Sequence, residues 1–183
     1  MIKRLIALTI FGLLLYSCST VDQTQNESTK ATDQQSVSDS SIPTWYSHKT
    51  RALRDSTTFT GLGMAVSIDS SSAAEQATTQ AKSHMMYSID AYVEDMRNKL
   101  IEDGDVGTLQ STDTILSIRE AVQSLNIGDN LLTADIMYKT DEESVTAYSK
   151  LSVDRTAVVE KLSTVIEHSQ LVDAIRSGTD QGM

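Results

Sequence analysis

Residues 59–68 of the chain read FTGLGMAVSI. This largely apolar run predicts a β-strand, because it is short and is bounded by polar residues. We expect Leu62, Ala65 or Val66, and Ile68 to face the core. A long helical pattern follows directly, so the strand is expected to lie against a helix.

The two glycines of this strand, Gly61 and Gly63, suggest two interpretations. A dinucleotide-binding loop would need a third glycine at position 66, where the chain has Val66. Its glycines would also lie between a strand and a helix and not within the strand. We therefore interpret the pair as allowing a bulge or a close contact with a helix or with the ring of Trp45.

The helix is predicted to begin at the capping box Ser72–Glu75 and to end near Asp103-Gly104, after about thirty residues. The small residues of its first half allow the backbone to approach the sheet, whereas the larger ones of its second half fill a wider gap. We interpret its methionines as core or interface residues and not as a metal-binding array. The apolar stripe consists of Ala74, Ala77, Ala81, Met85, Ile89, Tyr92, Met96 and Leu100.

The remaining pattern predicts a second helix over 112–125, two strands over 132–138 and 145–151 with a turn at 140–143, and a final helix over 154–168 that continues to 175 in one interpretation. This order is typical of an α+β two-layer sandwich. We expect an antiparallel sheet of about three strands, packed on one face against the long helix and one or two further helices. The domain is predicted to span 42–183, with a frayed C-terminal tail, and to begin around Pro43 and Trp45.

The first 17 residues have the pattern of a signal peptide. Lys3 and Arg4 precede an apolar run from Leu5 to Leu15 that is too short to cross a bilayer as a helix. The sequence Leu15-Tyr16-Ser17-Cys18 resembles the lipobox of bacterial lipoproteins. This resemblance implies cleavage before Cys18, a lipid on its thiol, and acylation of the new amino terminus with a chain such as palmitate. Ser19 in place of Asp implies, by resemblance to enterobacterial sorting, an anchor in the cell outer membrane.

Three quarters of residues 18–41 are Ser, Thr, Gln, Asp or Asn, and very few are apolar. Such a segment buries too little apolar surface to offset the entropy of ordering. We predict a disordered linker that separates the lipidated Cys18 from the folded domain.

Several features over roughly 43–165 together resemble the LPP20 family of bacterial cell envelope lipoproteins. They are the opening Pro43-x-Trp45-Tyr46, the strand Gly61-x-Gly63-x-Ala65, the Ala-rich helix through Ala81, and the closing strand pair from Thr133 to Asp154. Ala81 is followed by Lys82, where members of that family often have Arg. The resemblance implies an envelope lipoprotein and transfers no catalytic residue.

The charge and the polar residues exclude some functions. With 25 acidic and 15 basic residues the net charge is −10, which disfavours nucleic acid as a partner. Cys18 is the only cysteine, so no intrachain disulfide forms. His48, His84 and His168 have no second ligand at a metal-binding spacing. We predict no catalytic, cofactor or metal site.

The sequence leaves two functions open. The first is a membrane-anchored structural or protein-interaction module of the envelope without catalytic activity, either as a homodimer or with an unidentified envelope protein. The alternative is a lipid-anchored binder of a small apolar or peptide ligand between helix and sheet. That alternative needs a cavity lined by Met85, Tyr92 and Met96.

Overall fold

The computed structural model describes residues 42–104 and 107–180. The predicted signal peptide 1–17, Cys18 and the linker to residue 41 lie outside the described residues. The helices and strands, in chain order, are β1 Ala52–Arg54, β2 Thr58–Ser67, α1 Ser70–Glu102, α2 Thr112–Gln123, the short 3-10 helix η1 Asp129–Leu131, β3 Leu132–Thr140, β4 Val145–Asp154, α3 Arg155–Val165 and α4 Ser169–Asp180.

The strands form one antiparallel sheet in the order β1-β2-β4-β3. The predicted α+β class and the β3–β4 pair are confirmed, but the sheet has four strands and not three. The missed strand, β1, is three residues long and pairs with residues 59–61 of β2. Three residues are too few to show an alternating pattern, so only pairing in the folded chain defines this strand.

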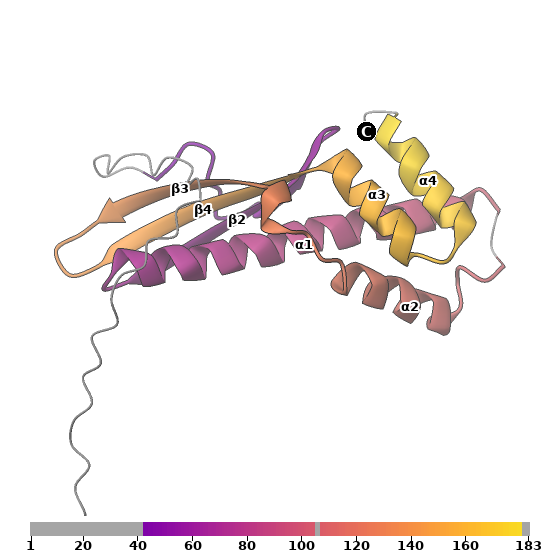
Figure 1. The fold of residues 1–183 in the computed structure, drawn as a ribbon, viewed down its shortest axis with the longest axis horizontal. Helices are drawn as coiled ribbons and strands as arrows, with labels where there is room; N and C mark the ends of the chain where they lie inside the picture. Colours follow the sequence, from indigo (N-terminus) through magenta and orange to yellow (C-terminus); the bar gives the residue numbers. More distant parts are fainter. Residues whose placement is uncertain (1–41, 105–106, 181–183) are drawn as a thin grey trace, which may run out of the picture. The chain divides into compact units, whose positions relative to one another are not determined.

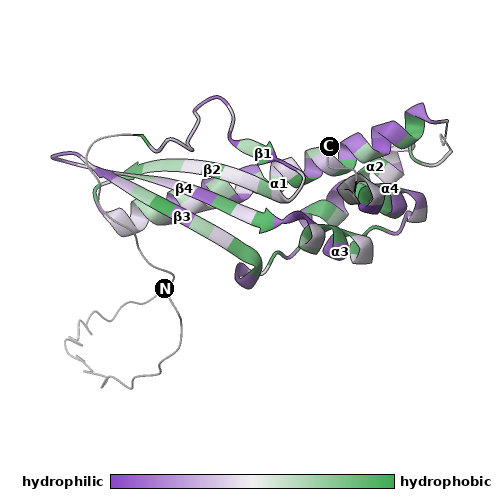
Figure 2. Cartoon of the chain, turned by 90° about the horizontal axis from the view of Figure 1, so that it is seen from above, coloured by the Kyte–Doolittle hydropathy of each residue, from purple (hydrophilic) through white to green (hydrophobic). Residues whose placement is uncertain are grey.

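Helix α1 covers one face of the sheet along β2 and β4 and extends past the strands to α2, α3 and α4 (Figure 1). Hydrophobic residues recur along β2, β3 and β4 between hydrophilic ones (Figure 2). The largest core cluster joins the second half of α1 to α2, α3, α4 and the Phe59 end of the sheet. A smaller cluster of Ala65, Ala73, Ala77 and Ala147 lies under the first half of α1.

The first half of α1 touches the backbone of β2. A Cβ atom on Gly61 would lie 1.9 Å from the carbonyl oxygen of Ala81, and one on Gly63 would lie 1.9 Å from that of Ala77. Ala77 and Ala81 are themselves fully buried. The interpretation of the two glycines as a close helix contact is therefore confirmed.

Of the expected core positions, Leu62 is buried, and so is Ala65 of the alternatives Ala65 and Val66. Val66 is 54% exposed, and the expectation for Ile68 is wrong, since it is 87% exposed. Because alternate residues face opposite sides of a strand, the contact of Gly61, Gly63 and Ala65 with α1 directs Val66 to the other face. Ile68 lies beyond the last residue of β2.

The opposite face of the sheet carries its own small cluster. Leu62 packs there with Tyr46 and Tyr148, and Trp45 and Met64 cover them in part. The ring centroids of Tyr46 and Tyr148 lie 5.0 Å apart in an edge-to-face arrangement. The segment before β1 thus lies across the sheet face that α1 leaves uncovered.

The predicted start of α1 is wrong, and its predicted end is confirmed. The N-cap is Asp69, whose carboxylate accepts a hydrogen bond from the backbone N–H of Ser72 at 2.8 Å, so the predicted start at Ser72 is wrong. The last residue of α1 is Glu102, Asp103 is the C-cap, and Gly104 has a φ of 94°, a conformation that favours glycine.

The predicted final helix is two helices. The chain leaves α3 at Ile166, which has extended backbone, and α4 begins at Ser169. The break turns α4 back onto α1, where Leu171 and Ile175 are fully buried, and it leaves Val165 exposed. A continuous helix would carry these apolar residues away from the core.

Replacing Gly61 with Ala tests the close contact. We expect Gly61→Ala to lower the free energy of unfolding by about 3 kcal/mol, because the new Cβ would collide with helix backbone that cannot move independently. Gly107→Ala is the matched control, since nothing lies within 4 Å of a Cβ there, and its effect should stay below about 1 kcal/mol. Urea unfolding of both variants measures the difference, and equal stability of the two would contradict the proposed contact.

Candidate functional site

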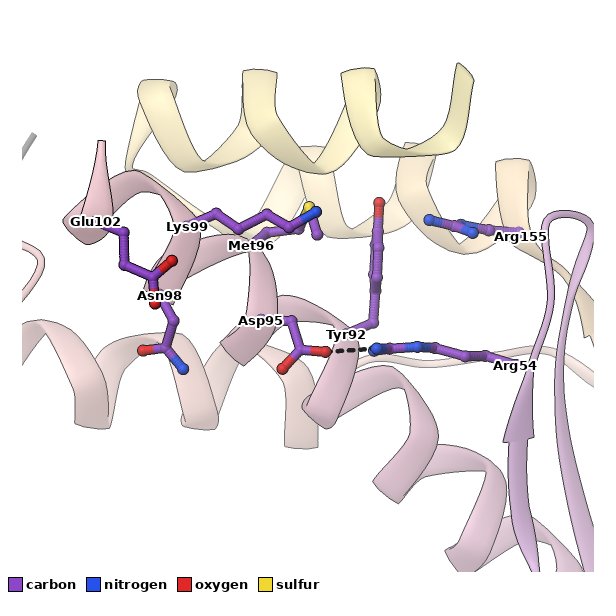
Figure 3. Close-up of a pocket in the computed structure, with 8 residues that line it drawn as sticks. All are labelled: Arg54, Tyr92, Asp95, Met96, Asn98, Lys99, Glu102 and Arg155. Atoms are coloured by element: carbon purple, nitrogen blue, oxygen red, sulfur yellow. Dashed lines mark hydrogen bonds and ion pairs between the residues drawn. The ribbon is translucent and has the colours of Figure 1, made fainter. Parts of the chain in front are cut away.

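A pocket of about 370 Å³ lies beside the second half of α1 (Figure 3). Strand β1, helix α1 and the start of α3 supply its walls. We call it the arginine pocket. Its lining residues are Arg54, Tyr92, Asp95, Met96, Asn98, Lys99, Glu102 and Arg155.

Arg155 forms the inner wall of the pocket and is only 2% exposed. Its Nη1 donates a hydrogen bond to the carbonyl oxygen of Asp55 and its Nη2 to that of Gly178, both at 3.0 Å. Its Nε has no hydrogen-bond partner within the part of the chain that the structure describes. The guanidinium carbon lies 4.4 Å from the ring centroid of Tyr92 and 5.9 Å from that of Phe59. Arg155 therefore places a permanent positive charge among aromatic rings and neutral carbonyls.

Tyr92 connects the parts of the arginine pocket. Its hydroxyl donates a hydrogen bond to the carbonyl oxygen of Ile175 at 2.6 Å, which fixes the ring beneath α4. The guanidinium carbon of Arg54 lies 5.8 Å from the same ring centroid. Arg54 also forms an ion pair with Asp95, drawn as the dashed line in Figure 3. Two guanidinium groups thus lie near one aromatic ring.

The turn between β1 and β2 holds Arg155 in place. The carboxylate of Asp55 accepts hydrogen bonds from the backbone N–H groups of Thr57 and Thr58, each at 2.7 Å, and from both threonine hydroxyls. The backbone N–H of Thr57, followed by its hydroxyl, lowers the pKa of Asp55 from the ordinary 3.8 to about 2. The turn orients the Asp55 carbonyl toward Arg155, and the backbone N–H of Arg155 donates to the Thr57 carbonyl.

The adjacent carboxylates Glu94 and Asp95 of α1 do not converge on one site. Asp95 pairs with Arg54, whereas its neighbour Glu94 pairs with Arg97 at 2.5 Å. The hydrogen bond from Arg97 lowers the pKa of Glu94. Within the described ranges no group of three His, Cys, Asp or Glu side chains has an arrangement that could hold a metal ion.

The three histidines lie apart. His84 is half-buried, and its Nδ1–H donates to the carbonyl oxygen of Leu62 at 2.7 Å. Two further side chains of α1 bond to strand backbone: Gln80 accepts from the N–H of Met64 in β2, and Ser88 donates to the carbonyl oxygen of Leu53 in β1. Such bonds satisfy backbone groups that no strand of the described sheet pairs with. The Nε2 atom of His168 lies 2.9 Å from the Thr108 hydroxyl. His48 packs edge-to-face against Tyr46 on the opposite face of the sheet.

The three residues of the predicted apolar cavity, Met85, Tyr92 and Met96, all belong to the largest core cluster. Tyr92 and Met96 also line the arginine pocket, whereas Met85 does not. Sequence reasoning missed Arg54 and Arg155 altogether. One signal was present for Arg155, because it falls three, four and seven residues before the buried Val158, Val159 and Leu162. A charged residue in an apolar register indicates a buried charge.

No protein-family model, curated protein or solved structure matches the chain. The resemblance to the LPP20 family therefore stays a prediction. Within 42–104 and 107–180, no helix is both long and apolar enough to cross a membrane.

The low pKa of Asp55 makes a testable contribution to stability. A lowered folded-state pKa contributes stability that is present above the ordinary value of 3.8 and is lost as the pH falls toward 2. Because Asp55 is exposed to screening solvent, we expect Asp55→Asn to cost only about 1 kcal/mol of unfolding free energy near neutral pH. The difference from the parent protein should shrink as the pH falls through that range.

Urea unfolding at a series of pH values measures this effect. Asp173→Asn is the control, because it removes an exposed carboxylate from α4 and leaves the turn intact. A stability difference for Asp55→Asn that did not change with pH would show that the charged carboxylate does not stabilise the turn.

Proposed function

We propose that the chain is a membrane-anchored lipoprotein of the cell envelope, and that its folded domain acts as a structural or protein-interaction module without catalytic activity. The N-terminal sequence carries this proposal. A basic start, an apolar run from Leu5 to Leu15 and the lipobox-like Leu15-Tyr16-Ser17-Cys18 occur in the order that lipoprotein processing requires. Ser19 favours the outer membrane as the site of the anchor.

Lipid on Cys18 would suffice for stable attachment. One acyl chain gives only marginal membrane binding, whereas two or more give stable anchoring. The polar linker to residue 41 separates Cys18 from the domain that begins near Pro43. The domain therefore needs no membrane contact of its own.

The exposed parts of the sheet support a role in interaction. Trp45 is half-buried on the face that α1 does not cover, where it packs against the cluster of Tyr46, Leu62 and Tyr148. Val66 of β2 is exposed. Aromatic residues of this kind are enriched at the centres of protein interfaces. Within the described residues, strand β3 pairs only with β4, so its outer edge is available to a strand of another protein or of a second copy. Sedimentation at several protein concentrations distinguishes these two partners.

Replacing Cys18 tests the anchor. We expect the native protein to partition into membranes and to carry the added mass of acyl chains on a residue that is now N-terminal. We expect Cys18→Ala to show neither. Intact mass spectrometry and membrane fractionation measure both properties.

Thr20→Ala is the matched control, since it changes a neighbouring residue and keeps the thiol. Unmodified, soluble native protein would overturn the proposal. Equal loss of anchoring in Thr20→Ala and Cys18→Ala would show that the thiol itself is not the site.

A further inference from the structure

We propose that the arginine pocket binds a phosphate group, held between the guanidinium groups of Arg54 and Arg155. This goes beyond the role of an anchored interaction module, because it assigns a ligand to the folded domain itself. The inference begins with the unusual environment of Arg155.

Arg155 is a buried charge to which the described side chains supply no counter-charge. An arginine cannot lose its proton under ordinary conditions, so burial leaves it charged. Within residues 42–104 and 107–178 no carboxylate pairs with it; its Nη atoms donate to two neutral carbonyl oxygens, and its Nε donates to nothing. The rings of Tyr92 and Phe59 offset the charge only in part. A buried cation of this kind is costly unless an anion reaches it.

Arg54 supplies the second binding group. It lies on β1, and its guanidinium approaches the same Tyr92 ring that Arg155 covers. Arg54 is about one-third exposed, so a ligand that enters from solvent meets it first. Guanidinium groups recognise phosphate through pairs of charged hydrogen bonds, and two of them around one ring define a site for a single anionic group.

The pocket is positive although the chain is negative. Its lining has three basic residues, Arg54, Lys99 and Arg155, and two acidic ones, Asp95 and Glu102, whereas the whole chain has a net charge of −10. Asp95 forms an ion pair with Arg54 when no ligand is bound. A phosphate group would displace this carboxylate, so Asp95 weakens binding and limits it to ligands that engage both arginines.

The size of the pocket indicates more than an inorganic ion. Its volume of about 370 Å³ is roughly ten times the share of one water molecule. A phosphate with a small organic group attached fits this space. Such a group has two sources: a soluble phosphate monoester, or the headgroup of a phospholipid in the membrane that anchors the protein. The second source rests on the proposed function, and the first does not.

The test uses the full-length chain in a non-ionic detergent at constant ionic strength. Calorimetric titrations with inorganic phosphate and with glycerol phosphate measure soluble ligands, and titration with a short-chain phosphatidylglycerol in the same detergent micelles measures the lipid source. We expect saturable binding of glycerol phosphate or of phosphatidylglycerol. Arg54→Gln should weaken it about tenfold, the usual effect of losing a charged hydrogen bond. Asp95→Asn should strengthen it several-fold by freeing Arg54.

Lys139→Gln is the matched control, because it removes the same charge from the β3–β4 hairpin, where Lys139 pairs with Asp141. It should leave binding unchanged. A substitution of Arg155 threatens folding. The contact of Arg155 with the ligand is therefore measured in the parent protein, by NMR of the arginine Nε–H groups. We expect the Nε–H signals of Arg54 and Arg155, each assigned by through-bond correlation to its own backbone, to shift on titration.

The outcomes separate the possibilities. Binding of glycerol phosphate supports a soluble ligand, and binding of phosphatidylglycerol alone supports a lipid headgroup. Absence of saturable binding, or an equal loss in Arg54→Gln and Lys139→Gln, overturns the proposal and leaves Arg155 as a structural clamp. An unmodified Cys18 would overturn the anchor without affecting the soluble-ligand arm, so the two proposals fail separately.

Discussion

The direct contact between the backbones of α1 and β2 is the constraint on which the rest of the structure depends. Gly61 and Gly63 leave no side chain in the interface, and Ala77 and Ala81 fit into the space. A contact this close fixes both the rotation and the position of α1 on the sheet, since any shift would bring backbone atoms into collision. Which residues of α1 face the core further along follows from this contact.

Beyond the glycines, α1 and the strands need larger side chains between them. Met85, Ile89 and Tyr92 fill this region, and α2, α3 and α4 complete it around the second half of α1. Arg155 joins the separate parts here, because it binds the β1–β2 turn, the end of α4 and the ring of Tyr92. One end of the domain is thus a tight helix–sheet contact, and the other is a mixed apolar and charged region that contains the pocket.

These two regions suit different tasks. The tightly packed end presents the sheet face opposite α1 and the β3 edge, whereas the other end holds two guanidinium groups at a common ring. Our proposals place a protein partner at the first and a phosphate group at the second. Neither depends on a catalytic group. Together they describe a domain that a lipid on Cys18 would keep close to its partners.

The sequence by itself determined the local features whose signal is contiguous: the strand around Gly61, the long helix and its end near Gly104, the β3–β4 pair and the α+β class. Periodic patterns and turn residues need no knowledge of distant neighbours. Only the tertiary structure decided the pairing of β1, the break before α4 and the approach of Arg54 and Arg155 to the ring of Tyr92. These depend on contacts between residues far apart in the chain; Arg155 and its partner Asp55 are separated by 100 positions. No local pattern records such a contact, because burial of a charge is specified by what surrounds it and not by its neighbours in sequence.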